Sequence, residues 1–227
     1  MTSDLRRLAG RQAREDHKGP KGFGGLAFGW RLFGLTALVA AWLAFSPATP
    51  LRAEVVVMLG DSLTAGGRWA DLKPGAEILN HGVSGDGAAE AAARVGAVAA
   101  ARPDQIFFQL GVNDLARGLS PRRAVEAQRE VWRALRAQAP QAVLIVCSLL
   151  PVRESGLTSA GGFNRLIRDM NDLLAQAAAE EGLTFVDLHG ALTGPDQQLP
   201  AAMTFDGLHL NPPAYDVWRA TLGTFLK

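Results

Sequence analysis

The 227-residue chain contains a single cysteine, Cys147, and this scarcity excludes several classes of protein. One cysteine cannot form an intramolecular disulfide, and there is no cysteine cluster to ligate a zinc ion. Cys147 stands in the apolar run 142–147. Because a reactive thiol needs a setting that stabilises its thiolate, we expect a small buried hydrophobic residue there instead.

The chain also lacks a marked excess of charge, since 23 Lys and Arg residues face 22 Asp and Glu residues. The balance is uneven along the sequence. Residues 1–31 carry seven basic against three acidic residues, and residues 32–227 carry sixteen against nineteen. A mildly acidic folded part without a basic stripe or a run of like charges argues against nucleic acid as a partner. No internal repeat or second-domain linker follows residue 54.

Residues 1–53 have the pattern of an export signal. A basic, Gly-rich segment precedes fourteen apolar or small residues, 32–45, and the break Ser-Pro-Ala-Thr-Pro. This order is typical of a signal peptide, and fourteen residues are fewer than the roughly 20 that span a bilayer. We therefore predict a signal peptide in front of a folded domain over residues 54–227, placed in the periplasm or secreted. An uncleaved membrane anchor over residues 24–45 is the alternative, and a buried core helix is the third interpretation.

From Glu54 onward, short apolar runs alternate with longer amphipathic segments. Strand–helix alternation of this kind is typical of a parallel sheet covered by helices on both faces. The pattern predicts an α/β fold, a three-layer α/β/α sandwich with a five-stranded parallel sheet, and favours the flavodoxin-like strand order 2-1-3-4-5. The expected strands are 55–59, 77–80, 105–110, 142–150 and 184–188; the expected helices are 88–101, 121–140, 163–182 and 213–226.

Polar residues of the types found in catalytic sites occur in four blocks after predicted strands. In an open parallel sheet, ligands bind outside the carboxyl ends of the strands, so these residues are expected to converge. The four blocks are Gly-Asp-Ser-Leu-Thr at 60–64, Gly-Val-Ser-Gly-Asp-Gly at 82–87, Gly-Val-Asn-Asp at 111–114 and Phe-Asp-Gly-Leu-His-Leu at 205–210.

Taken together, the four blocks resemble the SGNH, or GDSL, family of ester hydrolases, over residues 55–226. Within that family, Ser84-Gly85-Asp86, Leu149-Leu150-Pro151 and Asp206-x-x-His209-Leu210 are similar to the platelet-activating-factor acetylhydrolase alpha subunits and related acetylesterases. The resemblance implies hydrolysis of a carboxylic ester through an acyl-enzyme. The α/β-hydrolase version of this chemistry is disfavoured, because the chain has no Gly-x-Ser-x-Gly elbow. No cofactor and no metal are expected.

The resemblance implies a role for each site residue. Ser62 is the nucleophile, His209 the base that takes its proton, and Asp206 the carboxylate that orients the imidazole, each a role that acyl transfer requires. The backbone N–H groups of Ser62 and Gly85 and the side-chain amide of Asn113 are the expected oxyanion donors.

Each of these residues also has a plainer interpretation. Ser62 alone would suit a helix cap, Asn113 a turn and His209 a surface loop. Asp61, Asp86 and Asp114 are expected to fix loops through hydrogen bonds; we therefore give them no chemical role.

Two further residues have open assignments. His81 is assigned either to the mouth of the cleft or to a structural role. Trp69 is expected in the core, with the border of the site as the alternative.

Three other functions fit part of the pattern. The hydroxyl-rich segment 61–67 resembles a phosphate loop, so a non-catalytic flavodoxin-like binding protein is one alternative. An inert carbohydrate-binding module is another, and an acyl thioesterase using the same site is the third. The substrate candidates are acetyl esters of sugars, lysophospholipids and acyl thioesters. Few connections are long enough for a lid, so we expect an open site that prefers short acyl groups, and membrane association only through the N-terminal segment.

Overall fold

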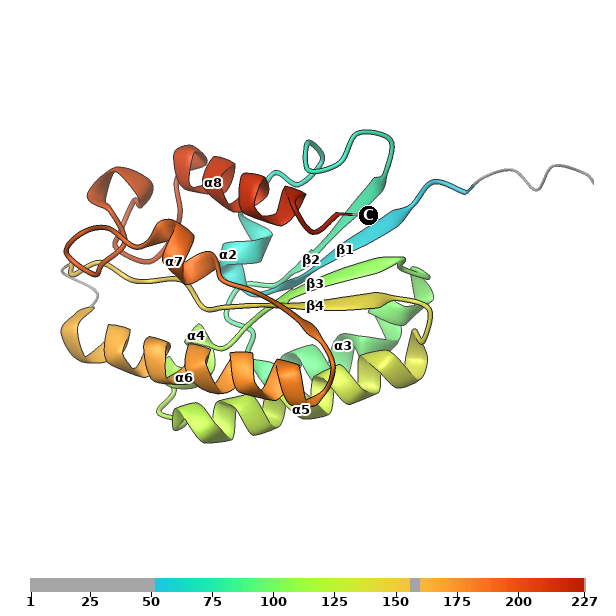
Figure 1. The fold of residues 1–227 in the computed structure, drawn as a ribbon, viewed down its shortest axis with the longest axis horizontal. Helices are drawn as coiled ribbons and strands as arrows, with labels where there is room; N and C mark the ends of the chain where they lie inside the picture. The colour runs from blue at the N-terminus through green and yellow to red at the C-terminus, as the bar shows by residue number, and fades with distance from the viewer. Residues whose placement is uncertain (1–51, 156–159, 227) are drawn as a thin grey trace, which may run out of the picture. The chain divides into compact units, whose positions relative to one another are not determined.

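Five parallel strands form one sheet in the order β2-β1-β3-β4-β5 (Figure 1). The computed structural model describes residues 52–155 and 160–226, so the predicted leader lies almost wholly outside the described residues. The strands are β1 (Val55–Gly60), β2 (Glu77–Gly82), β3 (Gln105–Gln109), β4 (Val143–Cys147) and β5 (Thr184–Val186). The helices are α2 (Ser62–Ala65), α3 (Ala88–Ala100), α4 (Val112–Ala116), α5 (Pro121–Gln138), α6 (Ala160–Glu180), α7 (Leu188–Leu192) and α8 (Pro212–Gly223), with a 3₁₀ turn, η1 (Ala201–Met203).

The sheet is sandwiched between two helical layers. Helices α3, α5 and α6 cover one face, and α8 lies over the other, with α2 and α7 on the same side (Figure 1). Strand order reverses at β1, because β2 lies on one side of it and the later strands lie on the other. Since crossovers between parallel strands are right-handed, this reversal puts helices on both faces of the sheet. The loops that follow β1 and β3 therefore run in opposite directions at the carboxyl ends of the strands. The predicted three-layer fold and strand order are confirmed.

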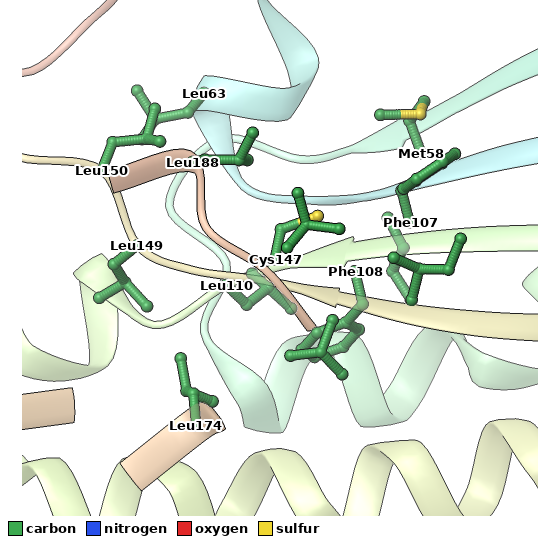
Figure 2. Packing of buried hydrophobic residues seen from close by; sticks show 14 of the residues in the cluster. Met58, Leu63, Phe107, Phe108, Leu110, Cys147, Leu149, Leu150, Leu174 and Leu188 are labelled. Carbon is green, nitrogen blue, oxygen red and sulfur yellow. The ribbon is translucent and has the colours of Figure 1, made fainter. Parts of the chain in front are cut away.

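The central strands are buried and mostly apolar because both of their faces are covered. Every residue of β1 and β3 is buried. Figure 2 shows this packing around the middle of the sheet, with Leu63 on the side of α2 and Leu174 on the side of α6. Cys147 lies among these side chains, and burial raises the pKa of its thiol well above the usual range. The prediction of a small buried residue at position 147 is confirmed.

Strand β4 is shorter than predicted. It ends at Cys147: Ser148 N–H still donates to the Val186 carbonyl of β5 at 2.9 Å, but from Leu149 onward backbone groups bond to asparagine side chains of α6. Leu149 N–H donates to Asn171 Oδ1 at 2.8 Å, and the carbonyl of Leu149 accepts from Asn171 Nδ2 at 3.0 Å. Asn164 makes the same two-way contact with Val152, at 2.9 and 2.8 Å. These side-chain amides satisfy buried backbone groups and steer the chain out of the sheet.

Helix α8 begins at Pro212, where Asn211 caps it, and it ends at Gly223 rather than at the predicted residue 226. Strand β5 ends at Val186 because Asp187 accepts a hydrogen bond from Gly190 N–H and starts α7. Short elements such as α2, α4 and α7 were not predicted, since a helix of four or five residues depends on tertiary contacts more than on periodicity.

None of the helices within residues 52–155 and 160–226 has the length and hydropathy needed to cross a bilayer.

Candidate functional site

Ser62 is the first residue of α2, a single helical turn held on three sides. The carboxylate of Asp61 caps the turn by accepting from Leu63 N–H at 2.9 Å. At the other end, the Tyr215 hydroxyl donates to the Leu63 carbonyl at 2.7 Å, and Trp69 Nε1 donates to the Thr64 carbonyl at 2.8 Å. A turn this short has no stability of its own, so these contacts fix the direction of the Ser62 side chain.

Gly60 lets α2 turn back tightly at the end of β1. A Cβ at this position would lie 2.0 Å from Thr64 Oγ1 and 2.6 Å from the Gln109 carbonyl. No larger residue fits there without moving either α2 or β3. Trp69, which assists α2, is buried and packs edge-on against Tyr215 and Trp218, with ring centroids 5.9 and 5.2 Å away. It is therefore a core residue and does not border the site.

His209 and Asp206 lie on a tight loop closed by an antiparallel bridge between Thr204 and Leu210. Thr204 Oγ1 donates to the His209 carbonyl at 2.8 Å and accepts from Gly207 N–H at 2.9 Å. Gly207 has a φ of +94°, which favours glycine, and its carbonyl accepts from Arg153 N–H at 2.7 Å. The loop is thus fixed both internally and against the segment that follows β4.

The structure brings Ser62, His209 and Asp206 into one hydrogen-bonded row. Ser62 Oγ lies 3.1 Å from His209 Nε2, and His209 Nδ1 lies 2.7 Å from Asp206 Oδ2. Because a carboxylate only accepts, Nδ1 carries the ring hydrogen and the neutral ring presents Nε2 as an acceptor to the Ser62 hydroxyl. The side chains of His209 and Asp206 are 46% and 33% exposed, so the row is open to solvent.

The ionisation of Asp206 follows from its contacts. Burial raises the pKa of this carboxyl, but hydrogen bonds from the His209 ring and from the N–H groups of His209 and Leu208 outweigh burial and lower the pKa to about 2. Asp206 is therefore a carboxylate at neutral pH, and it holds the imidazole in one tautomer.

The other two blocks meet beside this row. Asn113, in the first turn of α4, donates one amide hydrogen to the Asp86 carbonyl at 2.8 Å, which leaves its second amide hydrogen for another acceptor. Gly85 has a φ of +84° and is exposed. Neither Ser62 N–H nor Gly85 N–H donates a hydrogen bond to another described residue. Three N–H groups of the predicted oxyanion set thus have no acceptor among the described residues.

The three other aspartates hold loops, as predicted. Asp86 pairs with Arg94, whose Nε lies 2.9 Å from Oδ2, and Asp114 accepts from Ala88 N–H at 3.2 Å. Asp61 is fully buried, and its Oδ2 has no hydrogen-bond partner among the described residues. Burial raises the pKa of Asp61 to about 7; the hydrogen bond from Leu63 and the proximity of His209 offset this only in part.

Nothing in the described ranges groups three or more His, Cys, Asp or Glu side chains in a way that would hold a metal ion. His81 is half-buried on β2, next to Arg94, which donates to its carbonyl at 2.9 Å. Burial, with a further contribution from Arg94, lowers the pKa of His81. No hydrogen bond joins His81 to Ser62 or His209 in the described part of the chain, which favours the structural assignment.

A protein-family model described as the GDSL-like lipase/acylhydrolase family matches residues 58–217. The chain belongs to this family. It is therefore a hydrolase of the esterase class, and the Ser62–His209 pair is consistent with a serine hydrolase site. A search of curated proteins found no match.

Solved structures share the fold of this GDSL acylhydrolase at low sequence identity. A Streptococcus pneumonia protein provisionally named a platelet activating factor is 20% identical, with a TM-score of 0.69 over 86% of this chain and 99% of its own. A GDSL-like lipase from Bacteroides thetaiotaomicron is 20% identical, with a TM-score of 0.68 over 86% and 96%. A catalytic mutant of an acetylxylan esterase from Geobacillus stearothermophilus is 19% identical, with a TM-score of 0.60 over 74% and 92%. These likenesses bear on the fold alone.

Sequence reasoning missed the residues that support the acylhydrolase site. Tyr215 and Arg153 reach the site from distant parts of the chain, and no local pattern marks them. Arg117 was also missed, although it stands four residues after Asn113. That spacing puts two side chains on one face of a helix, so it would have been a signal had the short α4 been expected.

We expect Asp61→Asn to change how the stability of this acylhydrolase depends on pH. A carboxyl with a raised pKa stabilises the fold fully below the unfolded-state value, near pH 4, and that contribution is lost as pH rises through about 7. Urea unfolding from pH 5 to 8 should therefore show wild type losing free energy of unfolding relative to Asp61→Asn. Asp71→Asn, at an exposed carboxylate, is the control whose difference from wild type should stay flat. A flat difference for Asp61→Asn as well would contradict a raised pKa of Asp61 in the folded state.

Proposed function

We propose that this protein hydrolyses a carboxylic ester through an acyl-enzyme on Ser62. The observation that carries the proposal is the hydrogen-bonded row, with 3.1 Å from Ser62 Oγ to His209 Nε2 and 2.7 Å from His209 Nδ1 to Asp206 Oδ2. A serine hydroxyl is a weak nucleophile until an adjacent base takes its proton, and this row supplies that base together with the group that orients it.

In acylation, Ser62 Oγ forms a bond to the ester carbonyl carbon while its proton moves to His209 Nε2. The carbonyl oxygen becomes an oxyanion, which the N–H groups of Ser62 and Gly85 and the free amide hydrogen of Asn113 stabilise. Asp206 accepts from Nδ1 and stabilises the imidazolium. The bond between the acyl carbon and the alcohol oxygen then breaks, and Nε2 gives its proton to the leaving alcohol.

Deacylation repeats these steps with water. His209 Nε2 takes a proton from a water molecule as its oxygen attacks the acyl carbon, and the same N–H groups receive the second oxyanion. The bond to Ser62 Oγ breaks, Nε2 returns the proton to Oγ, and the acid leaves. Solvent exposure of the His209 side chain gives water a direct approach for this step.

We expect Ser62→Ala and His209→Ala each to lower kcat for p-nitrophenyl acetate almost to the background rate. The double variant should be little worse than either single variant, because the two side chains act as one unit. Initial rates of wild type and the three variants at saturating ester provide the test. Asp71→Ala, at an exposed position away from the row, serves as the control for expression and folding. Losses that multiply in the double variant would show that Ser62 and His209 act independently.

We propose further that the preferred substrates are esters of short acyl groups, an acetyl ester above all, with lysophospholipids and acyl thioesters as the alternatives. Two features support this preference. The triad side chains are partly open to solvent, and the loops that carry Gly85 and Asp206 place only single exposed apolar side chains, Val83 and Phe205, next to them. Binding energy rises with the apolar area that is removed from water. A site of this kind offers little enclosure to the distal part of a long chain.

The acyl preference predicts a declining series. With p-nitrophenyl acetate, butyrate, octanoate and palmitate, kcat/KM should be highest for acetate or butyrate and fall with further length. Phe205→Ala is informative as a matched variant, because this side chain is 75% exposed and adjoins Asp206. A steady rise of kcat/KM with chain length would contradict the preference. Parallel assays with acetyl thioesters separate esterase from thioesterase activity.

We also propose that the enzyme acts outside the cytoplasm, in the periplasm or secreted. The support is the basic and apolar order of residues 1–45, which is typical of a secretory signal. Cell fractionation of the full-length chain should find the enzyme outside the cytoplasm, and its N-terminal sequence would tell a cleaved signal from a retained anchor. A wholly cytoplasmic full-length chain would contradict the proposal.

A further inference from the structure

Arg117 contacts the loop that carries Gly85, a proposed oxyanion donor. It follows α4 directly as its C-capping residue. Its Nη2 donates to the Gly85 carbonyl, and its Nη1 lies 3.2 and 3.1 Å from the two carboxylate oxygens of Glu90. The guanidinium thus bridges the loop after β2 and the first turn of α3.

Glu90 is itself fixed in place. Its Oε2 accepts from Gly87 N–H at 2.8 Å, which satisfies a free backbone donor at the start of α3. The backbone N–H of Gly87, the N–H of Glu90 itself and the Arg117 side chain all lower the pKa of Glu90, so it is a carboxylate. Glu90 contacts Nη1 of Arg117 and so fixes the guanidinium, whose Nη2 donates to the Gly85 carbonyl.

Gly85 needs such a restraint more than other residues do. With a φ of +84° and no atom within 4 Å of where a Cβ would stand, Gly85 is not held by side-chain packing, and one backbone hydrogen bond, from Asp86 N–H to the Val83 carbonyl at 3.2 Å, closes the turn around it. A glycine moves between positive and negative φ at little cost. The direction of its N–H, the proposed oxyanion donor, is consequently set by what its adjoining peptide groups bond to.

Two consecutive carbonyls of this loop bond to side chains from one short helix. The Gly85 carbonyl accepts from Arg117, and the Asp86 carbonyl accepts from Asn113 Nδ2 at 2.8 Å. Asn113 and Arg117 stand four residues apart, at opposite ends of α4. Side chains from α4 and its C-cap therefore hold the carbonyl oxygens of both peptide groups that follow Gly85 N–H.

We propose that Arg117 is a positioning residue for the reaction: by holding the Gly85 carbonyl, it aims Gly85 N–H at the oxyanion. The proposal rests on the ester-hydrolase function proposed above. Arg117 does not touch the reacting atoms and acts through Gly85. Its side chain is 47% exposed and its ion pair with Glu90 is at the surface, where such pairs contribute little to stability. Loss of Arg117 should consequently affect the rate and spare the fold.

The test compares Arg117→Ala, Arg117→Lys and wild type with p-nitrophenyl acetate. Arg117→Ala should lower kcat roughly 10- to 100-fold, as misplacement of one group in a site does, with KM within about twofold and Tm unchanged. Arg117→Lys should recover part of the loss, because lysine keeps one donor but lacks the fork. Arg123→Ala, at an exposed arginine on α5, is the matched control and should behave as wild type.

A second readout separates positioning from a general structural effect. A trifluoromethyl ketone forms a tetrahedral adduct with a reactive serine, so its Ki should rise in Arg117→Ala by the same factor as kcat/KM falls. Rates are expressed per Ser62 that a fluorophosphonate titrates, so that partial unfolding of a variant cannot imitate the result. An unchanged kcat and Ki in Arg117→Ala, with active wild type, would overturn the positioning role alone. An inactive wild type would overturn the proposed hydrolase function and this inference with it.

Discussion

The contact between Ser62 Oγ and His209 Nε2 joins residues that are 147 positions apart, and the rest of the site is arranged around it. A 3.1 Å separation over that span requires that both ends be held independently. Ser62 is held by a helical turn with a cap and two aromatic donors behind it, and His209 by a loop that bonds to itself and to Arg153. The sheet makes the two ends meet, because it fixes where β1 stops and where the chain returns from β5.

The arrangement separates rigidity from reactivity. The groups proposed to react are partly exposed, whereas the contacts that aim them are mostly buried or made to backbone. Asp61 stands between these two sets, since it caps α2 with a fully buried carboxyl next to Ser62, the proposed nucleophile. Ionising a buried carboxyl is unfavourable, and burial therefore raises the pKa of Asp61. We infer that α2 needs this cap, although the buried carboxyl lowers the free energy of unfolding.

The sequence predicted the sheet and the three-layer fold because buried strands and amphipathic helices leave clear periodic patterns. It also marked the residues that the sheet edge would gather, since Ser62, Asn113 and His209 each stand in a distinctive block after the predicted sheet segments. Contacts between side chains and distant backbone groups leave no such pattern. The asparagines of α6 end β4 early, and Tyr215 and Arg117 fix the site from elsewhere in the chain, all through such contacts. Short helices such as α2 were not predicted for the same reason, because their stability comes from tertiary packing.

The central claim is that Ser62 is a nucleophile activated by His209. Fluorophosphonate labelling followed by peptide mapping tests it most directly, because the reagent modifies only an activated hydroxyl and the map shows which one. We expect a single modified peptide containing Ser62 in wild type and strongly slowed modification in His209→Ala. Modification of another serine, or an unlabelled Ser62 in folded wild type, would contradict it.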